Sequence, residues 1–269
     1  VADRFQIVRF IARGGMGEVY EAFDTKLQKR VALKTILPEF SRNPEARKQF
    51  HREIVVAQEG AHENICRVYD LVEHREPENP AADADGVVTC LTMQFLDGES
   101  LSARLGRSRP LPLREAMEVI EQIAGALDAL HRDGILHRDL KPSNVMLVKQ
   151  ENGTSRAIIT DFGLAKHFLP ARDPQYDSAG PSRVGAPYFM APEVLRHGEA
   201  TIASDMLSFG LLIDEMVTAS PAFPAASMAA LIALKITGEP VDPRERNPDL
   251  PREWSETIVR CLAREPENR

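Results

Sequence analysis

Residues 137–144 read HRDLKPSN, which places an acid, a cation and an amide within one short stretch. Asp139 can accept a proton from an incoming hydroxyl group, and Lys141 can neutralise a phosphoryl oxygen. Asn144 can offer an oxygen atom to a hard cation. Together these side chains supply the chemistry that a site of phosphoryl transfer needs.

Two further motifs follow this stretch, in the order and rough spacing of a single known pattern. They are Asp161-Phe162-Gly163 and Ala191-Pro192-Glu193. With these motifs the chain resembles the eukaryotic-like serine/threonine protein kinases of bacteria over essentially its whole length. The resemblance implies an α+β, bilobal protein-kinase fold. We expect a small antiparallel β-sheet lobe with one key helix, helix C, in residues 1–95, and a larger, mainly α-helical lobe in residues 96–269.

Bulk composition excludes several other classes of protein. A chain of 269 residues with 43% hydrophobic and 27% charged residues is ordinary for a globular protein and unlike a disordered, collagen-like or coiled-coil chain. The net charge of −7 argues against general affinity for nucleic acid. No apolar run is long enough to span a bilayer, and the first residues lack the layout of a signal peptide. We therefore expect a cytoplasmic segment without membrane contact of its own, with any membrane anchor of the parent protein outside these residues.

The three cysteines, Cys66, Cys90 and Cys261, are odd in number, widely separated and set among apolar residues. This pattern favours buried thiols in a reducing compartment over a disulfide. The sequence contains neither Cys-x-x-Cys nor His-Glu-x-x-His, so nothing in it suggests a zinc site.

Three strands are predicted near the N-terminus, at residues 5–12, 18–23 and 30–36, because β-forming residues alternate or cluster there between turn residues. The first turn, at residues 12–19, reads ARGGMGEV, and its glycines allow the backbone to approach a triphosphate closely. A strand follows this turn, whereas a Rossmann fingerprint or a P-loop would run into a helix. By resemblance, Gly14, Gly17 and Val19 belong to the turn over the phosphates, and Ala12 replaces the first glycine of the family pattern.

The third strand contains Val31-Ala32-Leu33-Lys34, which resembles another family motif. In that motif Ala32 lines the adenine pocket and Lys34 meets the α and β phosphates. Residues 43–60 predict a helix with a capping Asn, Pro at the first position and Gly as a stop. The resemblance assigns Glu53, at the edge of its apolar face, to an ion pair with Lys34. Without the neighbouring motifs, both residues would be taken for solvated surface groups.

Other nucleotide contacts follow from the resemblance alone. Residues 65–73 and 87–95 are predicted strands, joined by an exposed loop at residues 74–86. Met93 falls at the gatekeeper position, and the Gln94 carbonyl and the Leu96 amide are the expected hinge contacts with adenine. Met146 is expected to lie under the adenine ring, and Thr160 to border the nucleotide.

Two helices are predicted in the larger lobe. The first, at residues 112–132, is closed by Gly134. Its predicted apolar stripe is Met117, Ile120, Ile123, Leu127 and Leu130. The second, at residues 205–218, is apolar almost all round and is expected to be buried on most sides. Asp205 is expected to cap the N-terminus of this helix and, by resemblance, to anchor the catalytic loop.

Residues 145–148 and 157–160 predict a hairpin around Asn152-Gly153. Its second strand leads to Asp161, whose carboxylate should bind Mg²⁺ between the phosphates of ATP, with Asn144 supplying a further oxygen. A metal site of His131 and His137 is disfavoured, because these residues straddle a helix end. By resemblance, His137 supports the catalytic loop by packing and is not the base.

Residues 167–188 are rich in Pro, Gly, Ser and Asp, and they occupy the position of the activation segment. Arg138 resembles the arginine that pairs with a phosphorylated residue in this segment. No threonine occurs between Gly163 and Pro192. Our hypothesis is that Ser178 or Ser182 is the residue that is phosphorylated.

In the C-terminal part of the chain, one residue departs from the family pattern and one stretch matches it. Ala186 stands where serine/threonine kinases usually carry a threonine, whose hydroxyl bridges the catalytic aspartate and lysine, so turnover is expected to be lower. Residues 261–269 resemble the closing motif of the family, whose arginine pairs with Glu193. The family normally adds one more helix, so we expect a truncated domain.

The resemblance predicts transfer of the ATP γ-phosphoryl group to serine or threonine hydroxyls of protein substrates, with self-association for autophosphorylation. Lys141 favours Ser/Thr over Tyr as the acceptor. The alternative is a pseudokinase scaffold that binds nucleotide, since Ala12, Ala186 and Leu207 depart from the pattern. A small-molecule phosphotransferase would share the ATP site, but Ala191-Pro192-Glu193 and the activation segment favour a protein substrate.

Overall fold

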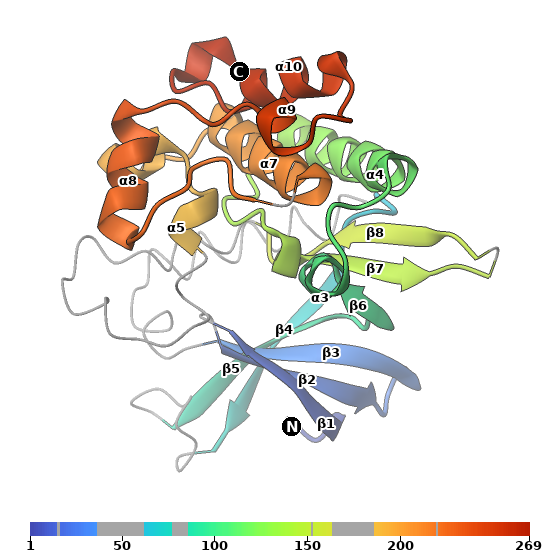
Figure 1. The fold of residues 1–269 in the computed structure, drawn as a ribbon. Coiled ribbons are helices and arrows are strands. Elements are labelled where there is room, and N and C mark those ends of the chain that lie inside the picture. The colour runs from blue at the N-terminus through green and yellow to red at the C-terminus, as the bar shows by residue number, and fades with distance from the viewer. Residues whose placement is uncertain (15–16, 37–61, 77–85, 152, 163–185, 219) are drawn as a thin grey trace. The chain divides into compact units, whose positions relative to one another are not determined.

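The computed structural model of the chain describes residues 1–14, 17–36, 62–76, 86–151, 153–162, 186–218 and 220–269 (Figure 1). These residues form two compact units, Val1–Asp97 and the described residues from Gly98 onward. Several predictions lie outside the described residues. They concern the helix at residues 43–60 with Glu53, most of the loop at residues 74–86, and the candidate phosphorylation sites Ser178 and Ser182.

The first unit contains an antiparallel sheet with the strand order β1-β2-β3-β5-β4. Its strands are β1 (Phe5–Gly14), β2 (Gly17–Asp24), β3 (Lys29–Ile36), β4 (Val68–Arg75) and β5 (Val87–Gln94). Each corresponds to a predicted strand. β4 begins later than predicted because Ile65 closes a turn, in which its amide donates to the His62 carbonyl over 3.1 Å.

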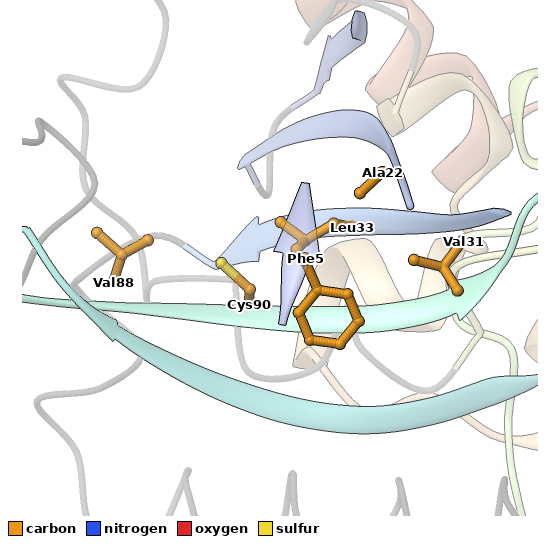
Figure 2. Close-up of a cluster of buried hydrophobic side chains, with 6 residues drawn as sticks. All are labelled: Phe5, Ala22, Val31, Leu33, Val88 and Cys90. Atoms are coloured by element: carbon orange, nitrogen blue, oxygen red, sulfur yellow. The ribbon is translucent and has the colours of Figure 1, made fainter. Parts of the chain in front are cut away.

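A hydrophobic cluster covers one face of this sheet. Figure 2 shows its members, which are Phe5, Ala22, Val31, Leu33, Val88 and Cys90. Full burial of a large apolar side chain stabilises a folded protein by about 1.5–3 kcal/mol. Successive side chains of a strand point to opposite faces, so Ala32 and Lys34 lie on the other face of β3. The core therefore fixes the face on which the predicted nucleotide-binding residues lie.

The second unit is mainly helical and includes a small antiparallel sheet with the order β6-β7-β8. Its strands are β6 (Gly98–Ser100), β7 (Val145–Lys149) and β8 (Ser155–Ile159). Its helices are α3 (Leu101–Arg107), α4 (Leu113–Arg132), α5 (Ala186–Phe189), α6 (Pro192–His197), α7 (Ile202–Val217), α8 (Met228–Thr237), α9 (Pro243–Arg246) and α10 (Arg252–Cys261), with short 3-10 turns η1 (Pro142–Asn144) and η4 (Pro266–Asn268). A small antiparallel sheet unit and a larger helical unit confirm the predicted fold class.

Helix α4 buries a stripe that differs from the predicted one. Its buried residues are Ala116, Val119, Ile123, Ala126, Leu127 and Leu130. Met117 is 39% exposed, so the predicted start of the stripe was wrong. The helix packs against α7 and β8. Hydrophobicity alone favoured the larger Met117.

Helix α7 is buried along most of its length, as predicted. Its N-terminus is closed by a capping box, in which Ser204 Oγ accepts a hydrogen bond from the Thr201 amide over 2.9 Å and Thr201 Oγ1 accepts one from the Ser204 amide over 3.3 Å. The predicted capping role of Asp205 was therefore wrong, because the helix begins at Ile202 and Asp205 lies within its first turn.

The closing motif folds back onto α6. The guanidinium of Arg269 makes two bonds to the Glu193 carboxylate, Nη1 to Oε1 over 2.6 Å and Nη2 to Oε2 over 2.9 Å. This bidentate pair confirms the predicted partnership of the terminal arginine with Glu193.

The cysteines Cys66, Cys90 and Cys261 are buried free thiols, as predicted. Burial raises the pKa of Cys90 to about 12 and also raises the pKa of Cys261. Across the part of the chain that the structure describes, no helix combines the length and the apolar character needed to cross a bilayer.

Candidate active site

The 137–144 loop is anchored by Asp205, which is 1% exposed. Its Oδ2 accepts a hydrogen bond from the His137 amide over 2.7 Å, and its Oδ1 accepts one from the Arg138 amide over 2.8 Å. Nε2 of His131, at the end of α4, lies 2.9 Å from Oδ2. Burial alone would raise the pKa of Asp205, but these hydrogen bonds outweigh it and lower the pKa. The charged carboxylate thus holds the start of the loop against α7.

Two non-glycine residues of this region adopt the left-handed backbone conformation. Arg138 has φ of 67° and Asp161 has φ of 60°. Such a conformation costs of order 1–3 kcal/mol for a residue with a side chain, and it persists only where the surrounding structure imposes it. At Arg138 the bond from its amide to Asp205 supplies part of that constraint.

Asp139, Lys141 and Asn144 gather within the loop. Lys141 Nζ lies 2.7 Å from Asp139 Oδ2. Asn144 Nδ2 donates to the same oxygen over 2.9 Å and to the Asp139 carbonyl over 2.8 Å. Charge-assisted bonds of this kind are roughly twice as strong as neutral ones, so they fix the orientation of the carboxylate. Because Asn144 donates through its nitrogen, its side-chain oxygen remains suited to a cation.

His137 is completely buried, and its ring contacts the backbone of the 137–144 loop. Its Nδ1 accepts a long bond from the Asp139 amide at 3.4 Å, which places the ring proton on Nε2. That Nε2 has no hydrogen-bond partner among the described residues. Burial lowers the pKa of His137, so the ring is neutral. These contacts are those of a packing residue.

The β7–β8 hairpin brings Asn144 and Asp161 to the same end of the small sheet. β7 begins directly after Asn144, and β8 ends shortly before Asp161. The Thr160 amide donates to the Asn144 carbonyl over 2.9 Å, which links the two segments. Met146 pairs with Ile158 in the same hairpin. Asp161 and Asn144 are therefore placed together by a single supersecondary motif.

In the first unit, the sheet register aligns the predicted nucleotide-binding residues. Ala12 pairs with Val19, and Val19 pairs with Lys34. Ala32 pairs with Met93 in the neighbouring strand. Residues directly opposite each other in an antiparallel pair present their side chains on one face, about 4.5–5.5 Å apart. Lys34 is only 5% exposed on this face.

Gly17 at the β1–β2 turn cannot carry a side chain. Its φ is 141°, and an added Cβ atom would lie 1.9 Å from the Thr35 carbonyl oxygen. Thr35 also braces the next residue, because its hydroxyl accepts a hydrogen bond from the Glu18 amide over 2.9 Å. The strand that carries Lys34 thus also fixes the end of the glycine turn.

The residues predicted to contact adenine through their backbone lie at the end of β5. The Gln94 amide donates to the Arg67 carbonyl over 2.8 Å, and the Gln94 carbonyl accepts a weak bond from Cys66 Sγ at 3.8 Å. A carbonyl oxygen has two lone pairs and can accept a second bond. The adenine contacts of Gln94 and Leu96 stay a prediction.

Comparison with known proteins identifies the family. The family described as protein kinase domain matches residues 5–269. The chain belongs to this family. The serine/threonine-protein kinase PknH of Mycobacterium bovis is 32% identical, over 98% of this kinase domain and 41% of its own length. The probable serine/threonine-protein kinase PknB of Lactococcus lactis is 33% identical, over 100% of this kinase domain and 40% of its own length.

The serine/threonine-protein kinase PknA of Mycobacterium tuberculosis is 34% identical to this kinase domain, over 99% of the domain and 58% of its own length. The kinase domain thus spans 40% to 58% of the length of these relatives.

Membership of the family implies ATP as a substrate and a requirement for a metal ion. Within the described residues, no three His, Cys, Asp or Glu side chains form a group that could bind a metal by themselves. Asp161 and Asn144 offer oxygen donors only, which suits a cation that completes its shell with phosphate oxygens and water. The residues present therefore fit the metal that the family requires.

Three residues that hold other segments of the chain in place were not predicted from the sequence. His131 contacts Asp205, Thr35 contacts the glycine turn, and Lys235 of α8 is buried against backbone carbonyls. A signal existed only for Lys235, which is the single charged residue in the apolar helix MAALIALKIT. The predicted ion pair of Lys34 with Glu53 lies outside the described residues.

Proposed function

We propose that this kinase domain is a serine/threonine protein kinase, which transfers the γ-phosphoryl group of ATP to hydroxyl groups of protein substrates. The observation that carries the proposal is the cluster of Asp139, Lys141 and Asn144 on one anchored loop. The cluster supplies a proton acceptor, Asp139, with a cation and an amide that each hydrogen-bond to the same carboxylate oxygen of Asp139. The names of the curated relatives, all serine/threonine-protein kinases, support the same activity.

Asp139 orients the substrate hydroxyl group and accepts its proton. Lys141, which shares the Asp139 carboxylate, neutralises charge on the transferred phosphoryl group. The transfer needs little covalent chemistry from the protein, so positioning and charge neutralisation account for most of the catalysis. Lys141 also favours serine and threonine over tyrosine as acceptors.

The residues that we assign to the nucleotide follow the family pattern. Lys34, kept in place by Glu53, binds the α and β phosphates, and the backbone of Gly14 and Gly17 covers them. The adenine ring contacts Ala32, Gln94, Leu96 and Met146, and Met93 occupies the gatekeeper position. Ala12 and Val19 belong to the turn over the phosphates, and Thr160 borders the nucleotide. The metal is Mg²⁺, held by Asp161 and Asn144, and when bound it neutralises charge on the phosphates.

Activity is regulated by phosphorylation of the activation segment in this proposal. Arg138 pairs with a phosphate on Ser178 or Ser182, because a guanidinium can bond two phosphate oxygens at once. Self-association of two copies allows one to phosphorylate the other. The domain acts in the cytoplasm, binds no nucleic acid, and makes no membrane contact of its own.

The test is phosphate transfer by the purified domain. The domain is incubated with Mg²⁺ and γ-labelled ATP, alone and with a generic protein substrate, and the labelled amino acids are identified. We expect phosphoserine or phosphothreonine, loss of labelling in EDTA, and recovery when Mg²⁺ is restored. Absence of transfer, or label on tyrosine only, would refute the proposal.

Mapping the sites in the same sample tests the regulatory part. Peptide mass mapping of active, autophosphorylated protein is expected to find phosphate on Ser178 or Ser182. Active protein modified at neither serine would remove both from the proposal. For a substitution of the catalytic acid Asp139, the matched control is Asp133→Asn, which changes an exposed acid just after α4 in the same unit.

A further inference from the structure

Helix α8 carries one lysine, Lys235, which is 1% exposed. A lysine is almost never fully buried unless its charge is partnered, because removal of an ammonium group from water is costly. Burial lowers the pKa of Lys235 to about 7, with a smaller lowering by Arg269 and an opposing effect of Glu193. Specific hydrogen-bonding partners must therefore stabilise this side chain inside the protein.

The partners of Lys235 are backbone carbonyl groups of one short segment. Its Nζ donates hydrogen bonds to the carbonyls of Pro187, Tyr188 and Met190. An ammonium group has three N–H donors, so each donor has an acceptor. The carbonyl of Phe189, which completes the run, accepts a bond from Ser208 Oγ over 2.8 Å. Two side chains thus hold all four carbonyls of residues 187–190.

Residues 187–190 need these partners because the segment cannot supply hydrogen-bond donors for its own carbonyl groups. Residues 187–189 belong to α5, a helix of a single turn, and the last carbonyls of a helix have no partner within it. α5 contacts α7 and α8, beside which it lies in Figure 1. The rings of Tyr188 and Phe223 lie 5.8 and 5.7 Å from Lys235 Nζ and shield it from water. Lys235 therefore acts as a clamp from α8.

The clamped segment and the catalytic loop share one anchor. Ser208 lies three residues after Asp205 on α7, and residues at this spacing are neighbours on a helix surface. Asp205 holds the amides of His137 and Arg138, while Ser208 holds the carbonyl of Phe189. One turn of α7 thus joins the loop that carries Asp139 to residues 187–190.

We propose that Lys235 is a positioning residue for the protein substrate. Lys235 fixes residues 187–190, and these residues form the surface that the incoming polypeptide contacts beside the Asp139 loop. This inference rests on the proposed function. The described residues assigned to the nucleotide lie in the first unit and at Met146, Asn144, Thr160 and Asp161, and none of them accepts a hydrogen bond from Lys235. Loss of the clamp therefore acts on the protein substrate and leaves ATP binding unchanged.

Steady-state kinetics with a serine-containing peptide test the proposal. Lys235→Met keeps most of the side-chain volume but removes all three donors, and we expect the KM for peptide to rise about tenfold while the KM for ATP changes less than twofold. Lys235→Arg, which retains a cation, is expected to recover most of the loss. An unchanged peptide KM in Lys235→Met, or equal rises for peptide and ATP, would overturn the proposal.

A milder pair of variants keeps the test informative if Lys235→Met does not fold. Ser208→Ala removes the bond to Phe189 and is expected to raise the peptide KM a few-fold. Ser255→Ala is its matched control, because Ser255 is also a buried helical serine, with one bond to Asp242 over 2.7 Å. A Ser208→Ala variant that behaves like Ser255→Ala would contradict the clamp.

Hydrogen exchange separates this proposal from the proposed function. In the Lys235→Met or Ser208→Ala variant, amides of residues 188–195 are expected to exchange at least about tenfold faster than in the wild type, with no such change in Ser255→Ala. This measurement needs no activity. If the wild type transfers no phosphate, the proposed function fails, and unchanged exchange would by itself refute the clamp.

Discussion

Lys141 Nζ lies 2.7 Å from Asp139 Oδ2, and the two side chains are 22% and 15% exposed. The cation and the acid are thus paired at a site that solvent and substrate can reach. One oxygen of Asp139 is engaged by both Lys141 and Asn144, which leaves the orientation of the carboxylate little freedom.

Asp139→Asn is expected to abolish transfer and to leave nucleotide affinity nearly intact. The amide keeps the shape of the carboxylate but cannot accept the proton of the hydroxyl group, a contribution of about 10²- to 10⁴-fold. Radiolabel transfer and nucleotide titration measure the two effects. Asp133→Asn should change neither, and substantial residual transfer by Asp139→Asn would refute the role given to Asp139.

Ala186→Thr is expected to raise the turnover number. In related kinases a threonine hydroxyl at this position bridges the catalytic aspartate and lysine, and a hydrogen bond to charged groups is worth roughly 1.5–3 kcal/mol. That range corresponds to one to two decades in rate. Ala186→Ser tests whether the hydroxyl alone is sufficient. An unchanged kcat in both variants would show that the bridge is dispensable in this chain.

Asp205→Asn is expected to lower both stability and activity. An amide side chain offers one oxygen, so it cannot accept the bonds that now come from the His137 and Arg138 amides to separate oxygens. Loss of charged hydrogen bonds costs about 1.5–3 kcal/mol, and the left-handed backbone at Arg138 loses its restraint. Urea unfolding and kcat report the two losses.

The control for Asp205→Asn is Asp128→Asn, since Asp128 is an exposed acid on α4 that pairs with Arg132 along the helix. Surface pairs of this kind contribute little to stability. Stability and kcat as low in Asp128→Asn as in Asp205→Asn would indicate a general effect of charge on this unit rather than anchoring of the loop.

The Arg4–Asp24 pair is expected to make the first unit less stable in acid. The hydrogen bonds from Arg4 lower the pKa of Asp24 to about 2, below its ordinary value of 3.8. The folded state therefore binds its proton at lower pH than the unfolded state. The stabilisation is fully present above about pH 4 and is lost as the pH falls through about 2.

Asp24→Asn isolates this charge, because an amide oxygen can still accept the bonds from the Lys26 and Leu27 amides. We expect the variant to lose about 1 kcal/mol at pH 7 and to unfold with a weaker dependence on pH between 4 and 2. Asp70→Asn is the control, since Asp70 is 51% exposed and reaches Arg4 only at 3.4 Å. Parallel pH curves for the wild type and Asp24→Asn would contradict the assignment.

Local sequence determined the elements and the motifs of this protein. Alternation predicted the strands of the first unit, and the apolar run at residues 205–218 predicted the buried helix α7. The 137–144 motif, followed by Asp161-Phe162-Gly163 and Ala191-Pro192-Glu193 in the expected order and rough spacing, was sufficient to indicate the family. These features depend on residues that are close in sequence, so a pattern of a few positions contains the information.

Tertiary packing decided which distant side chains meet at the site. His131 and Asp205 are 74 positions apart, and Lys235 lies 45 positions from the carbonyl of Met190. A buried polar group must find a partner wherever folding brings one, and that partner is not encoded near it in the sequence. The orientation of α4 was likewise decided by packing, because Ala116 is buried while the more hydrophobic Met117 is 39% exposed.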